Sequence, residues 1–378
     1  MTLTLAHQTM FADLVQRCQD ATFDEQYPEG GNFVRHGRGA REYWYYVPDM
    51  RQDPARRHVY VGPCDDPEID KRVAGFRSSK TNYRERRALV SSLRAAGLPH
   101  PDPLSGDVTE ALWKAGFFRL RGVLVGTVAF QTYAGLLGTK LAGASLMTGD
   151  VDVAQFHSVS RLVNDTMPGM EDVLKTVDPT FRAIPHSSGQ VISAAYINDK
   201  GYRVEFLTPN RGSNDNQGKP AKMPALGGTG AEPLRYLDFL IYQPVNAVLL
   251  HKGGIPVTVP KPERFAIHKL IVSRLRRSDP LGYAKANKDL TQAGLLILGM
   301  VWNKRADEPG FAWMEAWERG ANWRKHLIAA ARSLPHEINR ALETSIGIAC
   351  MASGEKNELY GTFDIRLASP NARITPSP

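Results

Sequence analysis

The chain has 378 residues, 42% hydrophobic and 23% charged, which is ordinary for a globular protein of two or three domains. A formal net charge of +8 favours a polyanionic partner. No run of about twenty apolar residues is present, so we expect no membrane association. Three widely separated cysteines favour a reducing cytoplasm over a disulfide framework or a zinc site.

The first 105 residues predict a helix followed by a small α/β unit. The amphipathic pattern near the N-terminus, with Phe11 and Leu14 on one side, predicts the helix. The aromatic and β-branched runs Tyr43–Val47 and His58–Val61 predict two strands of a hairpin. A Pro-rich stretch, 99–103, predicts a linker to the next part of the chain.

The segment Lys71–Ala96 predicts one or two helices with a basic surface. Cations and aromatic rings of the hairpin are the residue types that bind phosphates and stack on bases. The alternative is a small sheet with an aromatic core beside a solvated helix face. We favour that alternative for the aromatic residues and leave both interpretations open for the cations. These cations are Arg72, Arg77, Lys80, Arg84, Arg86, Arg87 and Arg94.

A short apolar run, Val123–Val125, ends at Gly126-Thr127 and is followed by a helix-like segment, Val128–Leu137. Glycine lets the backbone approach a phosphate, and a helix N-terminus presents unpaired N–H groups. The junction therefore predicts an anion-binding turn. By itself, a Gly-Thr pair is a weak signal.

Three carboxylates follow on predicted strands. Asp150 and Asp152 alternate with two valines, so on a strand both carboxylates share one face. Glu205 lies in a second alternating segment, Tyr202–Leu207. Oxygen ligands of this kind favour Mg²⁺ or Mn²⁺, and the third carboxylate allows a site for two ions. The alternative for the Asp pair is a turn or a solvated strand end.

The order of these motifs resembles the nucleotidyltransferase fold, the superfamily of DNA polymerase β and the minimal nucleotidyltransferases. That superfamily carries a glycine and a small hydroxyl residue before a helix, an Asp-x-Asp strand and a third acidic strand residue. The matching residues here are Gly126, Thr127, Asp150, Asp152 and Glu205. The gap between Gly-Thr and the Asp pair is longer than in compact members. The most similar branch is the bacterial one near the AbiEii-type toxins.

The resemblance implies an α+β fold with three parts. A nucleotidyltransferase-fold mixed sheet with flanking helices would occupy 106–260, between the small N-terminal α/β unit, 1–105, and a C-terminal helical domain, 261–378. Patterns inside these parts predict further elements. Strands are expected at Tyr236–Tyr242, Asn246–His251 and Ile255–Val259, and helices at Lys285–Met300, Phe311–Leu334 and His336–Met351. The Gly-, Asn- and Pro-rich segment 208–233 predicts a long loop that could close over a substrate, and the alternative is a flexible insertion.

The same branch has a Val-Pro strand end followed by a helix with a lysine before a leucine, a basic residue one turn later, and a Lys/Arg-Asp pair on the next helix. Lys269, Arg274 and Asp289 match these positions. The resemblance implies that Lys269 binds the nucleoside triphosphate and that Asp289 orients it. The alternative for Lys269 is a lysine on a helix surface, the commoner state of this residue.

These observations favour a metal-dependent nucleotidyltransferase that moves a nucleoside monophosphate from a nucleoside triphosphate (NTP) to a hydroxyl acceptor, with RNA or tRNA as the favoured acceptor. A protein or a small molecule is an alternative acceptor. A second hypothesis is an inactive nucleotidyltransferase-like module in a toxin–antitoxin or defence pair, acting with a partner protein. Two others are a two-metal nuclease and a plain nucleic-acid-binding protein with a chance Asp-x-Asp.

Overall fold

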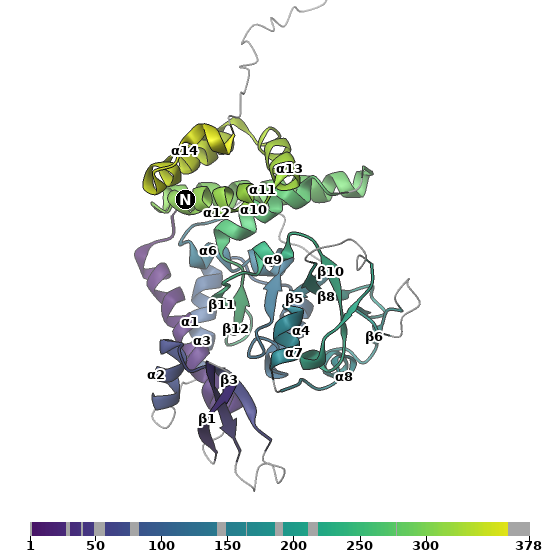
Figure 1. Cartoon of the computed structure of the whole chain (residues 1–378). Coiled ribbons are helices and arrows are strands. Elements are labelled where there is room, and N and C mark those ends of the chain that lie inside the picture. Colours follow the sequence, from purple (N-terminus) through teal and green to yellow (C-terminus); the bar gives the residue numbers. More distant parts are fainter. Residues whose placement is uncertain are drawn as a thin grey trace, which may run out of the picture. The chain divides into compact units, whose positions relative to one another are not determined.

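The computed structural model describes residues 2–27, 31–38, 41–48, 57–75, 83–141, 149–163, 165–185, 192–210, 218–276 and 278–361. The chain folds into two compact units, Met1–His268 (unit 1) and Lys269–Pro378 (unit 2). The expected α+β class is confirmed, because unit 1 combines a mixed sheet with helices and unit 2 is helical (Figure 1). The boundary expected at residue 105 stays a prediction. Of the predicted cations, Arg77 and Lys80 lie outside the described residues.

The main sheet of unit 1 has the strand order β4–β5–β8–β10–β9. β4 is antiparallel to β5, whereas β5 and β10 both run parallel to β8, and β9 is antiparallel to β10. β7 pairs with the start of β8 and with β6. The strands are β4 (Val123–Val125), β5 (Asp150–Ala154), β6 (Arg182–Ala183), β7 (Ala195–Ile197), β8 (Arg203–Pro209), β9 (Ala221–Lys222) and β10 (Gly230–Leu234).

The two central strands bury one face and leave the other partly exposed. Val151 and Val153 of β5, and Val204 and Phe206 of β8, are almost completely buried. The residues between them are partly or fully exposed. A period of two is the geometry of a strand, so the sequence alternation places the apolar residues in the core and the polar ones on the opposite face.

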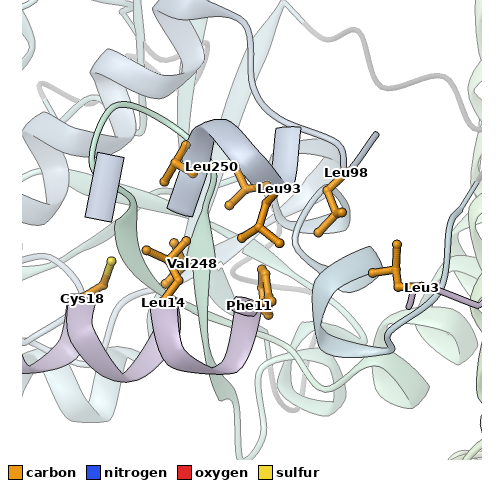
Figure 2. Packing of buried hydrophobic residues seen from close by; sticks show 9 residues of the cluster. Leu3, Phe11, Leu14, Cys18, Leu93, Leu98, Val248 and Leu250 are labelled. Carbon is orange, nitrogen blue, oxygen red and sulfur yellow. The ribbon is translucent and has the colours of Figure 1, made fainter. Parts of the chain in front are cut away.

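Helices and a β-hairpin enclose the core of unit 1. Figure 2 shows Phe11 and Leu14 of α1 gathered with Leu93 of α3 and with Val248 and Leu250. The amphipathic pattern of the N-terminal segment therefore predicted its buried face. The elements are α1 (Leu5–Gln26), α2 (Pro67–Gly75), α3 (Tyr83–Ala95), α4 (Pro103–Lys114), α5 (Gly126–Phe130), α6 (Tyr133–Leu136), α7 (His157–Leu162), α8 (Met170–Lys175), η2 (Pro224–Leu226), α9 (Leu237–Leu240), β11 (Val245–Leu249) and β12 (Ile255–Val259).

A separate antiparallel sheet near the N-terminus has the order β1–β2–β3. The predicted hairpin is confirmed as β2 (Arg41–Val47) and β3 (Val59–Pro63), and β1 (Asn32–Arg38) adds a strand that the sequence patterns did not indicate. One face of this sheet packs into a small core that includes Tyr27 and Tyr46. The favoured interpretation, an aromatic core, is therefore correct for that face.

Unit 2 is built from helices around Trp313, which is fully buried. The Trp313 indole Nε1 donates to the Tyr360 carbonyl at 3.1 Å. A Cβ at Gly310 would lie 2.1 Å from the Ser345 carbonyl oxygen. Glycine is therefore required where the helix that contains Gly310 packs against the helix that contains Ser345. The elements are α10 (Pro262–Ser273), which crosses the unit boundary, α11 (Pro280–Trp302), α12 (Asp307–Glu318), α13 (Ala321–Ala331), α14 (His336–Ser353) and η3 (Asn357–Tyr360).

Four expectations about local structure were wrong. Within Tyr236–Tyr242, Leu237–Leu240 form helix α9, because a short and mostly buried run carries no clear period that separates a helix from a strand. The segment 208–233 continues β8 and contributes β9 and β10, while 211–217 lie outside the described residues. Phe311–Leu334 is two helices, divided where Gly320 adopts φ 120°. Val128–Leu137 is likewise divided between α5 and α6, where the Thr132 hydroxyl donates to the Ala129 carbonyl at 2.8 Å.

Candidate active site

Two parallel strands place three carboxylates on one face of the main sheet. Asp150 and Asp152 are the partly exposed positions of β5, and Glu205 is the corresponding position of β8. In the strand register Asp152 is paired with Glu205, and Asp150 is paired with Arg203. Directly paired residues of neighbouring strands project to the same side. The structure thus brings the three predicted carboxylates to one surface.

Gly126 is held between the end of β4 and the Asp152 carboxylate. Its φ is +67°, a left-handed conformation that side chains other than glycine rarely adopt. A Cβ at this position would lie 2.4 Å from Asp152 Oδ2. Glycine is therefore required here for two reasons, backbone conformation and space, and both place the Gly-Thr turn directly against the acidic face.

The helix that follows this turn is shorter than expected. α5 contains only five residues, Gly126–Phe130, and Thr127 is partly buried. A helix of little more than one turn sums few peptide dipoles, so any attraction of an anion to its start depends on local N–H groups and not on a macrodipole. The structure therefore contains the predicted glycine turn, but the short helix offers little of the predicted helix-dipole contribution to anion binding.

The donor set on this face fits a divalent cation. Three carboxylates supply hard oxygen ligands, and the Arg203 guanidinium lies on the same face, with Nη1 3.5 Å from Glu205 Oε1. An arginine beside a carboxylate supplies the positive charge that an acidic cluster needs for balance. Arg203 is thus a residue of the site that the sequence patterns did not single out, although it lies two positions before Glu205 on the same strand face.

A different group of potential metal ligands is the tightest one among the described residues. Ligand atoms of Asp107, Glu110 and His251 all lie within 4.8 Å of one another, and no other such trio occurs in the described part of the chain. The Lys252 ammonium already occupies this group, with Nζ 2.7 Å from Asp107 Oδ1 and 2.5 Å from Glu110 Oε2. The trio therefore has the charge balance of an ion-pair network that joins α4 to the β11–β12 turn.

The pKa of Asp107 agrees with this interpretation. Burial alone would raise the pKa of its carboxyl, but hydrogen bonds from Lys252 and His251 outweigh burial and hold the pKa below its ordinary value. By contrast, the ligand atoms of Asp150, Asp152 and Glu205 are not all within 4.8 Å of one another.

A chain of hydrogen bonds fixes the start of β8 beneath the acidic face. The Tyr202 hydroxyl lies 2.6 Å from Ser105 Oγ, and Ser105 Oγ donates to Asp102 Oδ2 at 2.5 Å. Burial raises the pKa of Tyr202, and the negative charges of Asp102, Asp150 and Asp152 raise it further. The phenol therefore stays neutral and acts as an anchor. No pattern in the sequence indicated this contact.

Two of the three predicted nucleotide-binding residues of unit 2, Lys269 and Asp289, form a buried ion pair. Lys269 Nζ lies 2.6 Å from Asp289 Oδ1, and Arg276 Nε lies 2.8 Å from Asp289 Oδ2. The alternative of a surface lysine is wrong, because the Lys269 side chain is only 11% exposed. Burial would raise the pKa of Asp289, but the charges and hydrogen bonds of Lys269 and Arg276 outweigh it and lower the pKa.

Arg274 is exposed and belongs to a second basic cluster of unit 2. Its Nη1 lies 3.3 Å from the Ser333 hydroxyl oxygen. Desolvation lowers the pKa of His326, and the nearby charges of Lys325 and Arg274 lower it further. Arg274 and Lys325 therefore lie close enough to His326 for their charges to act on it, while burial is the larger cause of the lowered pKa.

The fold and the acidic face together define an enzyme class, since an Asp-x-Asp strand parallel to a strand with a third carboxylate, beside a glycine turn, is the arrangement of a nucleotidyl-transferring enzyme. A family model described as nucleotidyltransferase matches residues 104–318, more than half of the chain. The chain belongs to this nucleotidyltransferase family and is a transferase of that class. The AbiEii-type branch is not separately supported.

Neither the curated proteins nor the solved structures contain a match to the chain. Within the described residues, every helix is too short or too polar to cross a membrane.

Proposed function

We propose that the protein transfers a nucleoside monophosphate from an NTP to a hydroxyl acceptor, in a divalent-metal-dependent reaction that releases pyrophosphate. The observation that carries this proposal is the register of β5 and β8, which sets Asp152 beside Glu205 and Asp150 beside Arg203 on one face. Gly126 against the Asp152 carboxylate adds a turn at which an NTP phosphate can approach the same face.

Each residue of the face has a proposed role. Asp150 and Asp152 would hold a Mg²⁺ or Mn²⁺ ion associated with the triphosphate, and Glu205 would help to hold a second ion. Such ions supply charge neutralisation at the α-phosphate and a lower pKa for the attacking hydroxyl. The backbone N–H groups at Gly126 and Thr127 would orient the phosphates. The protein thus contributes positioning and charge, without a covalent intermediate.

Lys269, Arg274 and Asp289 are proposed as nucleotide-binding residues on separate grounds. Their positions match the pattern of the AbiEii-like branch that the sequence resembles, and the 2.6 Å contact between Lys269 and Asp289 supports the idea that Asp289 orients the lysine. The exposure of Arg274, with a second cation, Lys325, also near His326, supports phosphate binding. A buried lysine with a carboxylate partner is also a stabilising element, so its binding role needs a direct test.

RNA, including tRNA, is the acceptor we propose. The formal net charge of +8 favours a polyanion over a neutral small molecule. The three cysteines are free thiols, which agrees with the proposed cytoplasmic setting. A protein hydroxyl or a small molecule remains the alternative acceptor. A toxin–antitoxin or defence role in bacteria, with a partner protein, remains the alternative biological setting.

The test uses NTPs that carry a radioactive α-phosphate and measures which molecule holds the label after the reaction. The purified protein is incubated with each such NTP, Mg²⁺ or Mn²⁺, and total cellular RNA, and pyrophosphate release is measured in parallel. We expect label on RNA with the native chain and none with the variant Asp150→Asn/Asp152→Asn. A matched control is Asp199→Asn, which removes an exposed carboxylate that pairs with Arg182 at 2.6 Å elsewhere in unit 1.

Other outcomes assign the alternatives. Label on the protein itself would indicate protein modification, and label on a small molecule would remove RNA as the acceptor. RNA fragments without pyrophosphate release would indicate a nuclease. Nucleotide binding without transfer to any acceptor would indicate an inactive binding module. Full transfer by the Asp150→Asn/Asp152→Asn variant would overturn the proposed metal ligands.

A further inference from the structure

The sheet β1–β2–β3 has two faces with different surroundings. Phe33, Trp44, Tyr46, Val59 and Val61 point to the face that forms the small core with Tyr27 and Ile69. The alternate positions point to the opposite face, which we call the ring face. Its members on the three strands, with the residue before β3, are Asn32, Val34, His36, Arg41, Tyr43, Tyr45, Val47, His58 and Tyr60.

A hollow lies on the ring face and is lined by Asn32, Val34, His36, Val47 and His58. Its volume is about 450 Å³, which is within the range of ligand sites. Both histidines are exposed, whereas Val47 is buried. The buried Val47 therefore gives the hollow an apolar floor, and the two exposed imidazoles give it a rim of aromatic rings with polar edges. This combination suits the binding of flat aromatic groups.

The rings beside this hollow form a connected set. His36 and His58 are stacked with centroids 4.8 Å apart, and His36 Nε2 lies 2.9 Å from His58 Nδ1. The edge of this pair contacts Tyr45, whose ring centroid is 5.3 Å from that of His36. Tyr45 in turn meets Tyr60 at 5.7 Å. Mutual contacts fix the orientations of the two exposed imidazoles, so less side-chain entropy is lost when a base stacks on them.

The charge of the ring face fits a polyanion. No described ring-face position of β1–β3 carries a carboxylate. Arg41, on the face itself, is exposed. Glu42, the acidic residue of β2, alternates to the opposite face. A basic residue beside exposed rings, with no acidic residue between them, is the combination found in proteins that bind single-stranded nucleic acids.

The sheet is also held firmly to the part of unit 1 that contains the main sheet. The Tyr60 backbone N–H donates to Asp165 Oδ2 at 3.1 Å, and Arg119 Nη1 donates to the Tyr60 carbonyl at 2.7 Å. Arg119 and Asp165 form an ion pair with each other, and both side chains are at most 15% exposed. The buried Arg119–Asp165 pair thus binds both the N–H and the carbonyl of Tyr60, and it holds β3 rigidly in place as part of a binding surface.

We propose that the ring face binds single-stranded RNA, with bases stacked on His36 and His58 over the hollow and phosphates beside Arg41. This inference rests on the proposed function for its biological meaning, because the bound strand would be the acceptor of the transfer reaction. The binding itself is independent of catalysis. It does not require metal, NTP or the three carboxylates, so it is measurable on its own.

The test is the affinity of the full chain for a fluorescein-labelled oligouridine of about ten nucleotides, a length within known single-strand site sizes. Fluorescence anisotropy gives the Kd without metal or NTP. Stacking on an aromatic side chain changes affinity by roughly tenfold or more per base, so we expect His36→Ala/His58→Ala to raise Kd at least about tenfold. His36→Phe/His58→Phe keeps both ring planes and should bind within about threefold of the native chain.

A matched control separates stacking from total charge. Arg182→Ala removes one exposed cation of unit 1 away from the ring face, and it should change Kd by less than about twofold at physiological salt. Arg41→Ala should weaken binding and reduce the salt dependence. Circular dichroism checks the fold of every variant, and the exposed positions of both histidines favour intact folding.

Three results would overturn the inference. One is a Phe variant as weak as the Ala variant, since the histidines would then act through their nitrogen atoms and not by stacking. Another is an equal loss with Arg182→Ala, which would indicate unspecific attraction. The third is no binding of the oligouridine while the native chain still transfers labelled nucleotide to another acceptor, which would reject the RNA surface and leave the proposed chemistry intact. Binding without any transfer would keep the surface and reject the chemistry.

Discussion

The substitution Gly126→Ala tests the candidate site through its backbone. Gly126 has φ +67°, and a Cβ would lie 2.4 Å from Asp152 Oδ2. The left-handed conformation costs a residue with a side chain about 1–2 kcal/mol. The added methyl group also displaces the carboxylate, since ordinary contact begins near 3.4 Å. Asp152 must therefore retreat by about 1 Å, or rotate away from its position.

The backbone strain at Gly126 and the displacement of the Asp152 carboxylate should affect stability and activity to different extents. Rotation of an end group is cheap, so we expect the free energy of unfolding to fall by only about 1–2 kcal/mol. A misplacement of about 1 Å at a reacting centre costs roughly a hundredfold in rate. The expected outcome of Gly126→Ala is thus a folded protein with transfer activity reduced by about two orders of magnitude and weaker Mn²⁺ binding by calorimetry.

Gly201→Ala is the matched control for this experiment. Gly201 has φ +80° in the same unit, and a Cβ there meets no atom within 4 Å. It therefore carries the same backbone strain without the contact. Urea unfolding should show similar losses of stability for both variants, while transfer and Mn²⁺ binding should fall only for Gly126→Ala. Equal activities of the two variants would refute the assignment of Asp152 to the site.

Three further predictions concern charge. Arg203→Gln removes the cation beside Glu205, so calorimetry should show Mn²⁺ binding up to about fivefold tighter, and weaker binding would mean that Arg203 supports the site. Lys269→Met leaves the buried Asp289 carboxylate with one cation fewer and should lower the free energy of unfolding by about 3 kcal/mol, whereas an unchanged urea midpoint would show that the pair adds no stability. Because the pKa of Asp289 is lowered from 3.8, its contribution is present above that pH and is lost as pH falls through the folded-state pKa. Acid titration of the native chain and of Asp289→Asn should therefore diverge in stability above about pH 4 and converge below it.

Local patterns in the sequence were sufficient for much of the architecture. The alternation around Asp150 and Asp152 predicted a strand with two carboxylates on one face, and β5 has that form. The amphipathic segment with Phe11 and Leu14 predicted a helix and its buried side. Both predictions depend on the period of the backbone, which neighbouring residues alone determine.

The structural predictions that were wrong concern segments in which the periodicity of apolar residues gives no information. Tyr236–Tyr242 is short and mostly apolar, with Asp238 as its one charged residue, so its pattern was compatible with both helix and strand, and tertiary packing selected α9. Strand β1 lacks a run of β-branched residues and exists because β2 supplies its hydrogen bonds. The burial of the Lys269 side chain also depended on residues outside its helix, since its partner Asp289, and Arg276, which shares Asp289, lie on other segments of unit 2.

Local sequence patterns were enough to show which residues of this protein could act together: a glycine turn, two aspartates two positions apart and a glutamate on an apolar strand. That these residues share one face follows from the folded sheet and not from any local pattern. The register that pairs Asp152 with Glu205 is set by hydrogen bonds between strands far apart in the chain. The same holds for Arg203, for the hydrogen bond between Tyr202 and Ser105, and for the hollow beside His36. Non-local contacts of this kind form only when the core has brought the strands side by side, and no local pattern encodes them.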